Sequence, residues 1–420
     1  MKVIDIDITP QLKKALNTTA FLFNPSIARV KDDLFLVSVR SFIHDPSKPP
    51  DSNPLLKNNT QHPWKTGWKG ATDFSLIVPV RITGEKFEPL ATGEWPIKTV
   101  GKDLRLYKFI DSEKYSVYIL TFNKIFQDPD ILIKGGERCD EDCFIIGWAL
   151  MIVNTDTLDV HYVESNEPLC SNISNKQDKN WSVWSFKIAD RIHTMLSYEL
   201  VPFQSAFEFS TKNIITQGGK NCGMITPNYA IVYKGYQLLS GIEQLYENNV
   251  IISLSTPAYE IVPGLYQAVG HMKVKLAYLF SLIGSTKTPL ARFATKYIVP
   301  EGGKVHYHSQ YVYFMFIYRF TSIATNVVTR INLPLTTITP AFVGATEEYD
   351  YFLNFPSGIH IGKDNTIISY GDGDKTSHLM KIKNGEVEAF LESISELIPE
   401  TFLFSHAKKN INGEMEFLKA

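Results

Sequence analysis

Short runs of hydrophobic residues, often alternating with polar ones, recur along the whole chain. LFLVSVR (34–40) and YVYFMFIYRF (311–320) are typical of these runs. Aromatic and β-branched side chains favour the pleated surface of a strand, and clusters of Gly, Pro, Asn, Asp and Lys between the runs indicate turns. We therefore predict strands in these two runs and in residues 73–81, 115–122, 144–153, 191–200, 228–242, 365–371 and 378–391.

Helical patterns are few. They predict helices near residues 6–16, 276–284 and 391–398, while Asn384-Gly385 is a strong signal for a two-residue hairpin turn. Strands and helices do not alternate as they do in βαβ units, which argues against a parallel doubly wound sheet. We predict an all-β fold whose strands are mostly antiparallel.

A long series of short antiparallel strands must protect its edges, and a β-propeller does this by radial repetition. No break in composition separates two parts, so we predict a single β-propeller domain over residues 1–420, with a C-terminal tail at 392–420. Residues 41–72 form a long insertion rich in Pro, Asn and Lys. A loop of that length often acts as a lid over a site, and a solvated insertion is an equal alternative.

The charge balance narrows the class of partner. Lys and Arg total 42, Asp and Glu total 44, and the formal net charge is −2, which argues against a nucleic-acid protein with a strongly basic face. The sequence contains no run of about 18 uninterrupted apolar residues, so we predict no membrane span. The N-terminal segment lacks a signal-peptide core. We expect a soluble cytoplasmic protein and leave open whether it forms an oligomer.

The cysteines stand at positions 139, 143, 170 and 222 and are too few for a fold built on disulfides. Cys139 and Cys143 have the spacing of a metal clip, with acidic residues between them, but no second Cys or His pair nearby matches it. We therefore expect structural or surface thiols, no metal and no cofactor.

Polar motifs lie at the ends of four hydrophobic runs, where a propeller gathers loops around a central pocket. Asp103 and Arg105 are separated by one residue, so on a strand both side chains would share a face, as a structural ion pair or as part of a site. Trp181 would belong to the core or would stack on a sugar ring. The motifs are FNPSIARV (23–30), ahead of the strand that ends at Arg40; GKDLRLYKF (101–109); DKNWSVW (178–184); and FPSGIHIGKDNTIISYGDGD (355–374).

In this order the motifs resemble those of glycoside hydrolase family 130, the β-mannoside phosphorylases, and of the related β-1,2-mannosyltransferases. Asp103 and Arg105 match an E-D-P-R-like motif, although Lys102 stands at its acid and Leu104 at its proline. An F-P-x-G strand and a later Y-G-x-x-D motif are matched by Phe355, Pro356, Gly358, Tyr370, Gly371 and Asp374.

The resemblance implies a five-bladed β-propeller with a few short peripheral helices, and an enzyme that acts on mannoside-like sugars. Asp103 would be the catalytic proton donor. The histidine of the family's motif would be His271 or, as a second candidate, His306 or His308. The residues that would bind sugar or phosphate are Arg40, Arg105, Lys179, Asn180, Trp181, His271, Tyr370 and Asp374.

The chemistry of the glycosidic bond sets what such a site requires. A proton must reach the leaving oxygen, and one carboxylic acid suffices when phosphate is the nucleophile, whereas an inverting hydrolase needs a second carboxylate to activate water. The forked donors of arginine suit phosphate. Because a proton donor must be protonated, we expect burial to raise the pKa of Asp103 against the lowering effect of a neighbouring arginine.

We therefore expect glycosyl transfer or phosphorolysis of a mannoside-like glycan by an inverting mechanism. The substrate would be a small molecule or an oligosaccharide, with inorganic phosphate, a sugar phosphate or a nucleotide sugar as the second substrate. Two alternatives stay open: a non-catalytic propeller that binds a glycan or a protein, and a propeller-type glycoside hydrolase.

Overall fold

The structure is a computed structural model of the chain. It describes residues 3–43, 72–90, 93–99, 101–132, 134–165, 168–169, 180–188, 191–199, 205–209, 232–234, 250–281, 283–284, 295, 311–321, 354–374, 376–389, 405–409 and 415–418. The 41–72 insertion and the helix predicted at 391–398 lie almost wholly outside these ranges.

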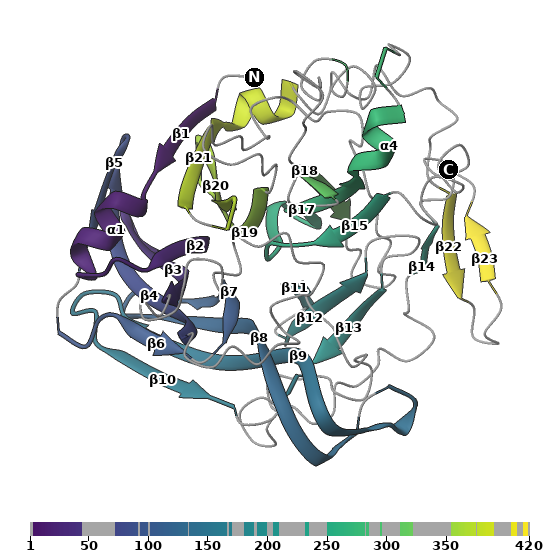
Figure 1. Cartoon of the computed structure of the whole chain (residues 1–420), viewed down its shortest axis with the longest axis horizontal. Helices are drawn as coiled ribbons and strands as arrows, with labels where there is room; N and C mark the ends of the chain where they lie inside the picture. The colour runs from purple at the N-terminus through teal and green to yellow at the C-terminus, as the bar shows by residue number, and fades with distance from the viewer. Residues whose placement is uncertain are drawn as a thin grey trace.

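The described strands form antiparallel sheets that are arranged in a ring around the middle of the molecule (Figure 1). Three sheets come from the first half of the chain. Their strands are β2 (Phe21–Lys31), β3 (Leu34–Ile43), β4 (Thr72–Thr83), β5 (Lys86–Pro89) and β6 (Ile97–Thr99) in the first; β7 (Lys102–Asp111), β8 (Tyr115–Leu132), β9 (Arg138–Asn154) and β10 (Val160–Glu164) in the second; and β11 (Ser182–Ile188), β12 (Arg191–Glu199) and β13 (Ser205–Phe209) in the third.

Three further sheets come from the second half and from the two ends of the chain. Their strands are β14 (Val232–Lys234), β22 (Ser405–Lys409) and β23 (Met415–Leu418) in one; β15 (Val250–Leu254), β16 (Tyr259–Val262), β17 (Leu265–Lys275) and β18 (Tyr311–Thr321) in another; and β19 (Asn354–Ile361), β20 (Asn365–Asp372), β21 (Thr376–Lys383) and β1 (Val3–Asp7) in the last.

The fold is all-β and propeller-like. Among the described residues, four of the six sheets have four or five strands and two have three, so the expected count of five blades is not confirmed. Most of the predicted strands are confirmed, from residues 34–40 within β3 to 365–371 within β20. The run predicted at 228–242 is described only at β14.

Helices are short and few in the described ranges. α1 (Thr9–Ala15) and α4 (Leu276–Ser281) confirm two of the predicted helices. The hairpin turn predicted at Asn384 is wrong, because residues 384–389 are helical. Asn384 begins this helix while its side chain donates to the carbonyls of Gly362 and Lys363, at 2.9 and 3.0 Å, and so closes the β19–β20 turn instead of forming one of its own.

Hydrophobic clusters fill the spaces between neighbouring sheets. Leu36 of β3 packs in a cluster with Leu104 of β7, while the next residue, Val37, packs in another with Ile367 of β20. Successive residues of a strand point to opposite faces, so β3 is covered on both sides. This explains why its sequence is almost continuously apolar, a pattern typical of strands buried on both faces.

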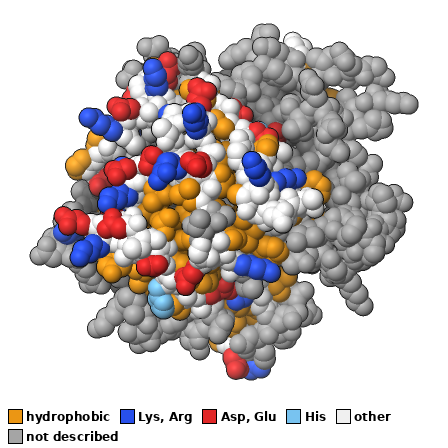
Figure 2. Space-filling view, turned by 90° about the vertical axis from the view of Figure 1, so that its left-hand side faces the viewer, with side chains coloured by type: hydrophobic (Ala, Val, Ile, Leu, Met, Phe, Trp, Pro, Cys, Tyr) orange, Lys and Arg blue, Asp and Glu red, His pale blue; other side chains and the backbone are white. Residues whose placement is uncertain are grey.

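The outer surface on the left of Figure 1 carries hydrophobic side chains in its middle, with charged side chains around them (Figure 2). A folded protein keeps much apolar area on its surface, so this mixture is ordinary. Within the described ranges, no helix has the length and apolar character needed to cross a membrane.

Cys139 and Cys143 are joined by a disulfide within β9, where the pairing of β8 with β9 shifts register. Both side chains are fully buried. The expectation of two thiols is therefore wrong for this pair, whereas Cys170 and Cys222 lie outside the described residues.

The first strand of the chain completes the last sheet. β1 pairs with β21 from Val3 opposite Ile382 to Asp7 opposite His378. Polar side chains reinforce this closure, because the Asp5 carboxylate accepts a hydrogen bond from the Tyr370 hydroxyl at 3.0 Å and lies 3.2 Å from His378 Nδ1. The N-terminal strand β1 is thus joined to β21 by strand pairing and by the Asp5–His378 contact.

Stability should fall as the pH rises through neutrality because of this closure. Burial lowers the pKa of His378, but the hydrogen bond and the charge of Asp5 outweigh it, so the pKa is raised overall. The His378–Asp5 contribution is therefore fully present below the ordinary histidine pKa of about 6.5 and is lost as the pH rises through the raised value. Urea unfolding across this range measures the effect.

Asp5→Asn removes the charge that raises this pKa and should flatten the decline, whereas Asp156→Asn, in an exposed ion pair with Lys31, should leave it unchanged. An equal decline in wild type and Asp5→Asn would contradict this assignment.

Candidate active site

Three inner segments of the ring carry a polar residue in the left-handed backbone region. Asn24 has a φ of 50°, Asp103 of 52° and Asn180 of 68°. Asn and Asp tolerate this region better than other non-glycine residues. At Asn24 and Asp103 the strands also shift register, between Phe23 and Ser26 in β2 and between Lys102 and Arg105 in β7. Such bulges re-aim side chains, and here they bring the polar groups of neighbouring sheets together.

The Asp103 carboxylate lies at the centre of this cluster and accepts from three side chains. Asn24 Nδ2 donates to Oδ1 at 2.8 Å, and Asn123 Nδ2 of β8 donates to Oδ2 at 3.3 Å. Arg40 Nη1 of β3 lies 3.1 Å from Oδ1 and 3.4 Å from Oδ2. Only 7% of Asp103 and 9% of Arg40 is exposed, so the ion pair is largely withdrawn from water.

Asp103 is ionised at neutral pH in this arrangement. Burial alone would raise its pKa, but the charge of Arg40, the Asn24 hydrogen bond and the charge of Arg105 together lower the pKa to about 2. The expectation of a raised pKa for Asp103 is therefore wrong. The reason is that three donors and a second guanidinium all favour the carboxylate form.

Arg105 is held by three acceptors other than the Asp103 carboxylate. Its Nε donates to the Ser255 carbonyl, its Nη1 to the Asp103 carbonyl at 3.0 Å and its Nη2 to Asn180 Oδ1 at 2.9 Å. Burial lowers its pKa to about 10, which still leaves it protonated at neutral pH. The prediction that Asp103 and Arg105 share one strand face is thus corrected. The bulge at Asp103 lets its carboxylate pair with Arg40 of the neighbouring sheet.

His271 of β17 adjoins this cluster through Ser255. Its Nδ1 lies 2.6 Å from Ser255 Oγ, and its ring stacks on Tyr313 with centroids 5.8 Å apart. Burial raises the pKa of Tyr313, and the negative charge of Asp374 raises it further. Asp374 therefore lies near the stacked rings of His271 and Tyr313. Asp374 has a φ of 53°, in the same backbone region as Asn24, Asp103 and Asn180.

The structure divides the remaining candidates. Trp181 is 1% exposed and belongs to the hydrophobic cluster with Tyr107 and Val183. Tyr370 directs its hydroxyl to Asp5 at the ring closure and stacks on His378, rather than facing Asp103. The candidates that lie outside the described residues are Lys179, His306 and His308.

Sequence reasoning missed three members of the cluster. Asn24 stands in the N-P-S-I motif, and an Asn-Pro dipeptide is a turn signal that marks the bulge in retrospect. Asn123 and Ser255 lie in or after ordinary strand runs without any local signal. Their roles depend on contacts with residues 20 and 150 positions away in the chain.

A glycine makes room for Asn24. A Cβ at Gly371 would lie 2.1 Å from Asn24 Oδ1 and 2.7 Å from its backbone nitrogen. Gly371→Ala should therefore displace the bulge that carries Asn24 and cost about 1–3 kcal/mol of unfolding free energy, the usual range for overpacking. Urea unfolding measures the loss.

Gly385→Ala is the matched control, because in the described part of the chain no atom beyond its neighbours and its own helix backbone lies within 4 Å of the added Cβ, and the residue is helical. It should be neutral or stabilise by about 0.5–1 kcal/mol. Equal effects of the two substitutions would show that Asn24 is not confined by Gly371.

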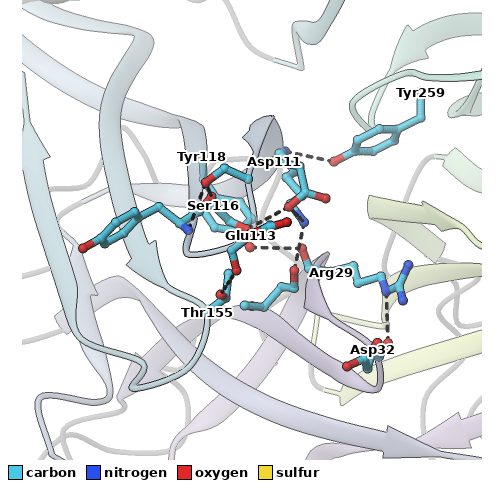
Figure 3. A network of polar contacts seen from close by, with 12 residues as sticks. Arg29, Asp32, Asp111, Glu113, Ser116, Tyr118, Thr155 and Tyr259 are labelled. Carbon is cyan, nitrogen blue, oxygen red and sulfur yellow. Dashed lines mark hydrogen bonds and ion pairs between the residues drawn. The ribbon is translucent and has the colours of Figure 1, made fainter.

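A second polar network lies at the other end of β7 (Figure 3). Ser116 donates to Asp111 at 3.3 Å, and the Tyr118 hydroxyl donates to the Arg29 carbonyl at 3.0 Å. Lys108 Nζ lies 2.7 Å from Asp111 and donates to the Val30 carbonyl at 2.9 Å. These donors and acceptors satisfy one another's hydrogen bonds across two sheets. This indicates that the network is structural. Within the described ranges, no group of three or more His, Cys, Asp or Glu side chains is arranged to hold a metal ion.

The chain resembles several solved structures in the course of its backbone. No protein-family model and no curated protein sequence matches it. A β-1,2-mannobiose phosphorylase from Listeria innocua superposes with a TM-score of 0.49 at 14% identity, over 94% of this chain and 100% of the other. A mannose phosphorylase from Leishmania mexicana gives 0.42 at 11% over 87% and 84%, and a GDP-Man-dependent mannosyltransferase from that organism gives 0.41 at 12% over 90% and 89%. At TM-scores below 0.5, this likeness carries no argument about activity or site residues.

Proposed function

We propose that the chain is a carbohydrate-active enzyme that transfers a mannose-like sugar, to phosphate or to an acceptor glycan, with inversion. Asp103 is the proton donor to the glycosidic oxygen, directly or through a sugar hydroxyl. Arg40 is the cation that meets an anionic group of the second substrate, whether phosphate or a sugar phosphate.

The convergence of charged residues from distant parts of the chain carries this proposal. Arg40, Asp103 and Arg105 are all less than a tenth exposed, yet they lie in one cluster with Asn180. Burying a carboxylate and two guanidiniums costs free energy that an apolar core would not, and buried charged groups with shifted pKa values cluster at functional sites. One carboxylate among cations is also the set that a phosphorolytic inversion requires.

The exposure and the contacts of the two arginines support distinct roles for them. Arg105 is 2% exposed and its hydrogen bonds tie β7 to Asn180 and Ser255, so it positions the site. Arg40 lies on β3 of the neighbouring sheet with its guanidinium 5.0 Å from the Phe23 ring, and 10% of its side chain is exposed. Arg40 is therefore the arginine that a substrate can reach.

A non-catalytic glycan-binding propeller is the second candidate, and one observation favours it. The pKa of Asp103 is lowered to about 2, so the site holds a carboxylate rather than an acid at neutral pH. A binding protein has no need of a protonated Asp103, whereas the proposed enzyme requires a step that protonates it.

A substrate panel decides between these functions. The full chain is incubated with manno-oligosaccharides with and without inorganic phosphate, and separately with nucleotide sugars and a mannoside acceptor. Products are followed by chromatography and the anomeric configuration by NMR. An enzyme of the proposed class forms an inverted mannose phosphate or a lengthened glycan, and Asp103→Asn suppresses it.

Each other outcome has a definite meaning. Cleavage without phosphate identifies a hydrolase. Glycan binding without turnover on the whole panel identifies a binding propeller. In both cases the proposed transfer activity is rejected.

A further inference from the structure

Two residues of the last sheet lie against the segment of β2 that carries Asn24. Ser377 of β21 and Gly371 of β20 stand directly opposite each other in that sheet. We propose that Ser377 is a positioning residue of the candidate active site: it fixes the bulge of β2 that carries Asn24, and Asn24 in turn orients the Asp103 carboxylate. In its consequence for catalysis, this inference rests on the proposed function.

The Ser377 hydroxyl forms the direct link to β2. Its Oγ donates to the Leu22 carbonyl at 3.0 Å, and neither residue is exposed to solvent. The register of β2 shifts just after Leu22, between Phe23 and Ser26. Loss of a buried hydrogen bond is costly because the carbonyl is left without that donor. Ser377 therefore holds β2 immediately ahead of its bulge.

Gly371 provides the second point of contact with β2. A Cβ at this position would lie 2.1 Å from Asn24 Oδ1 and 2.7 Å from the Asn24 backbone nitrogen, so β20 approaches the bulge closely. On its other side, Asn24 Nδ2 donates to Asp103 Oδ1 at 2.8 Å, closer than Arg40 or Asn123 comes to the carboxylate. A hydrogen bond weakens when its distance or its angle departs from the ideal. Any displacement of the bulge therefore weakens the bond to Asp103.

The N-terminal segment holds the backbone of Ser377 in place. The Ser377 N–H donates to Thr9 Oγ1 at 2.8 Å, and the Ser377 carbonyl accepts from the Ile8 N–H at 2.9 Å. Thr9 and Ile8 are both buried. The backbone of Ser377 is thus fixed by one segment while its hydroxyl bonds another, so this residue connects the N-terminal segment to the bulge of β2.

A positioning role and a merely structural role predict different energetic coupling between Ser377 and Asp103. If Ser377 only stabilises the ring, removing its hydroxyl costs the same whichever residue stands at position 103. If it places Asn24 on the carboxylate, the cost falls once a neutral amide replaces that carboxylate, because hydrogen bonds to charged groups are the stronger ones. A double-mutant cycle measures this coupling and requires no turnover.

Urea unfolding of four proteins completes the cycle: wild type, Ser377→Ala, Asp103→Asn and the double variant. We expect Ser377→Ala to lower the unfolding free energy more in the wild-type background than in Asp103→Asn. Thr366→Ala is the matched control, because it removes a buried hydroxyl at the other end of β20 that donates to Asn384 Oδ1 at 2.9 Å. Its loss should be the same in both backgrounds.

The proposal is overturned if Ser377→Ala costs the same in both backgrounds, or if Thr366→Ala shows the same coupling. Should Asp103→Asn not fold, Asn24→Gly replaces it in the cycle with the same expectation, because glycine tolerates the positive φ of this position. Should Ser377→Ala not fold, Ser377→Cys weakens the same bond, since a thiol is a weak donor.

Kinetics extend the test to catalysis. Because a small misplacement of a catalytic group is costly, Ser377→Ala should lower kcat about 10–100-fold with little change in KM, whereas Thr366→Ala should keep the wild-type kcat. An active wild type whose Ser377→Ala variant retains its full kcat would overturn the proposal. Coupling in the cycle without turnover on the whole substrate panel would reject the transfer activity and leave the positioning of Asp103 by Ser377 standing.

Discussion

Replacing Asp103 by asparagine is expected to lower the turnover of a mannoside about 10²–10⁴-fold, the usual contribution of a general acid, while sugar still binds. Asparagine keeps the shape and tolerates the positive φ of this position, but it has no proton to give to the leaving oxygen. Steady-state kinetics should show a fall in kcat with little change in KM, and calorimetry should show retained sugar binding.

The pH profile separates a proton donor from a structural partner of Arg40. If Asp103 donates the proton, the residual activity of Asp103→Asn loses the alkaline limb that wild type shows as the acid deprotonates. Leaving groups that need no protonation, such as a nitrophenolate, should recover part of the rate. An Asp103→Asn variant as active as wild type would reduce Asp103 to a structural role. Asp156→Asn serves as the control for charge and should be fully active.

Loss of the Arg105 side chain is expected to produce the largest change in stability. Arg105→Met removes a buried guanidinium and leaves the Ser255 carbonyl, the Asp103 carbonyl and Asn180 Oδ1 without their donor. Breaking a buried charged network in this way typically costs about 3–5 kcal/mol. Urea unfolding of wild type and variant measures the difference in unfolding free energy, and the two m-values should agree.

Arg81 provides the matched control for Arg105. Its ion pair with Asp33 spans 3.4 Å and its side chain is 50% exposed, so Arg81→Met should cost no more than about 1 kcal/mol. A loss for Arg105→Met as small as that for Arg81→Met would show that Arg105 does not tie the inner strands together. The proposed rigid role of this arginine would then be withdrawn.

The strand-rich architecture is predictable because its signal is local. In β3, hydrophobic residues alternate between two buried faces, and Leu36 and Val37 pack into the clusters on either side. Such runs, with turn residues between them, are typical of strands that are buried on both faces. The short helix α1 is likewise marked by the proline near its start.

Hairpin prediction at Asn384 failed for a tertiary reason. The Asn-Gly pair satisfies the local requirement for a tight turn, but the Asn384 side chain bonds Gly362 and Lys363 more than 20 positions earlier. Local turn chemistry competes with such distant contacts, and the sequence does not reveal which contact is formed.

The composition of the candidate site was partly determined by the sequence and its arrangement was not. The D-L-R motif marks Asp103 and Arg105 as chemically capable residues, but a regular strand would place both on one face. The bulge and the positive φ of Asp103 turn its carboxylate to Asn24 and Arg40 of the adjoining sheet instead. That choice depends on how the sheets pack around the ring, which brings residues 63 and 79 positions apart into contact. Pairing between sheets, and with it the protonation state of Asp103, is therefore decided by the tertiary structure alone.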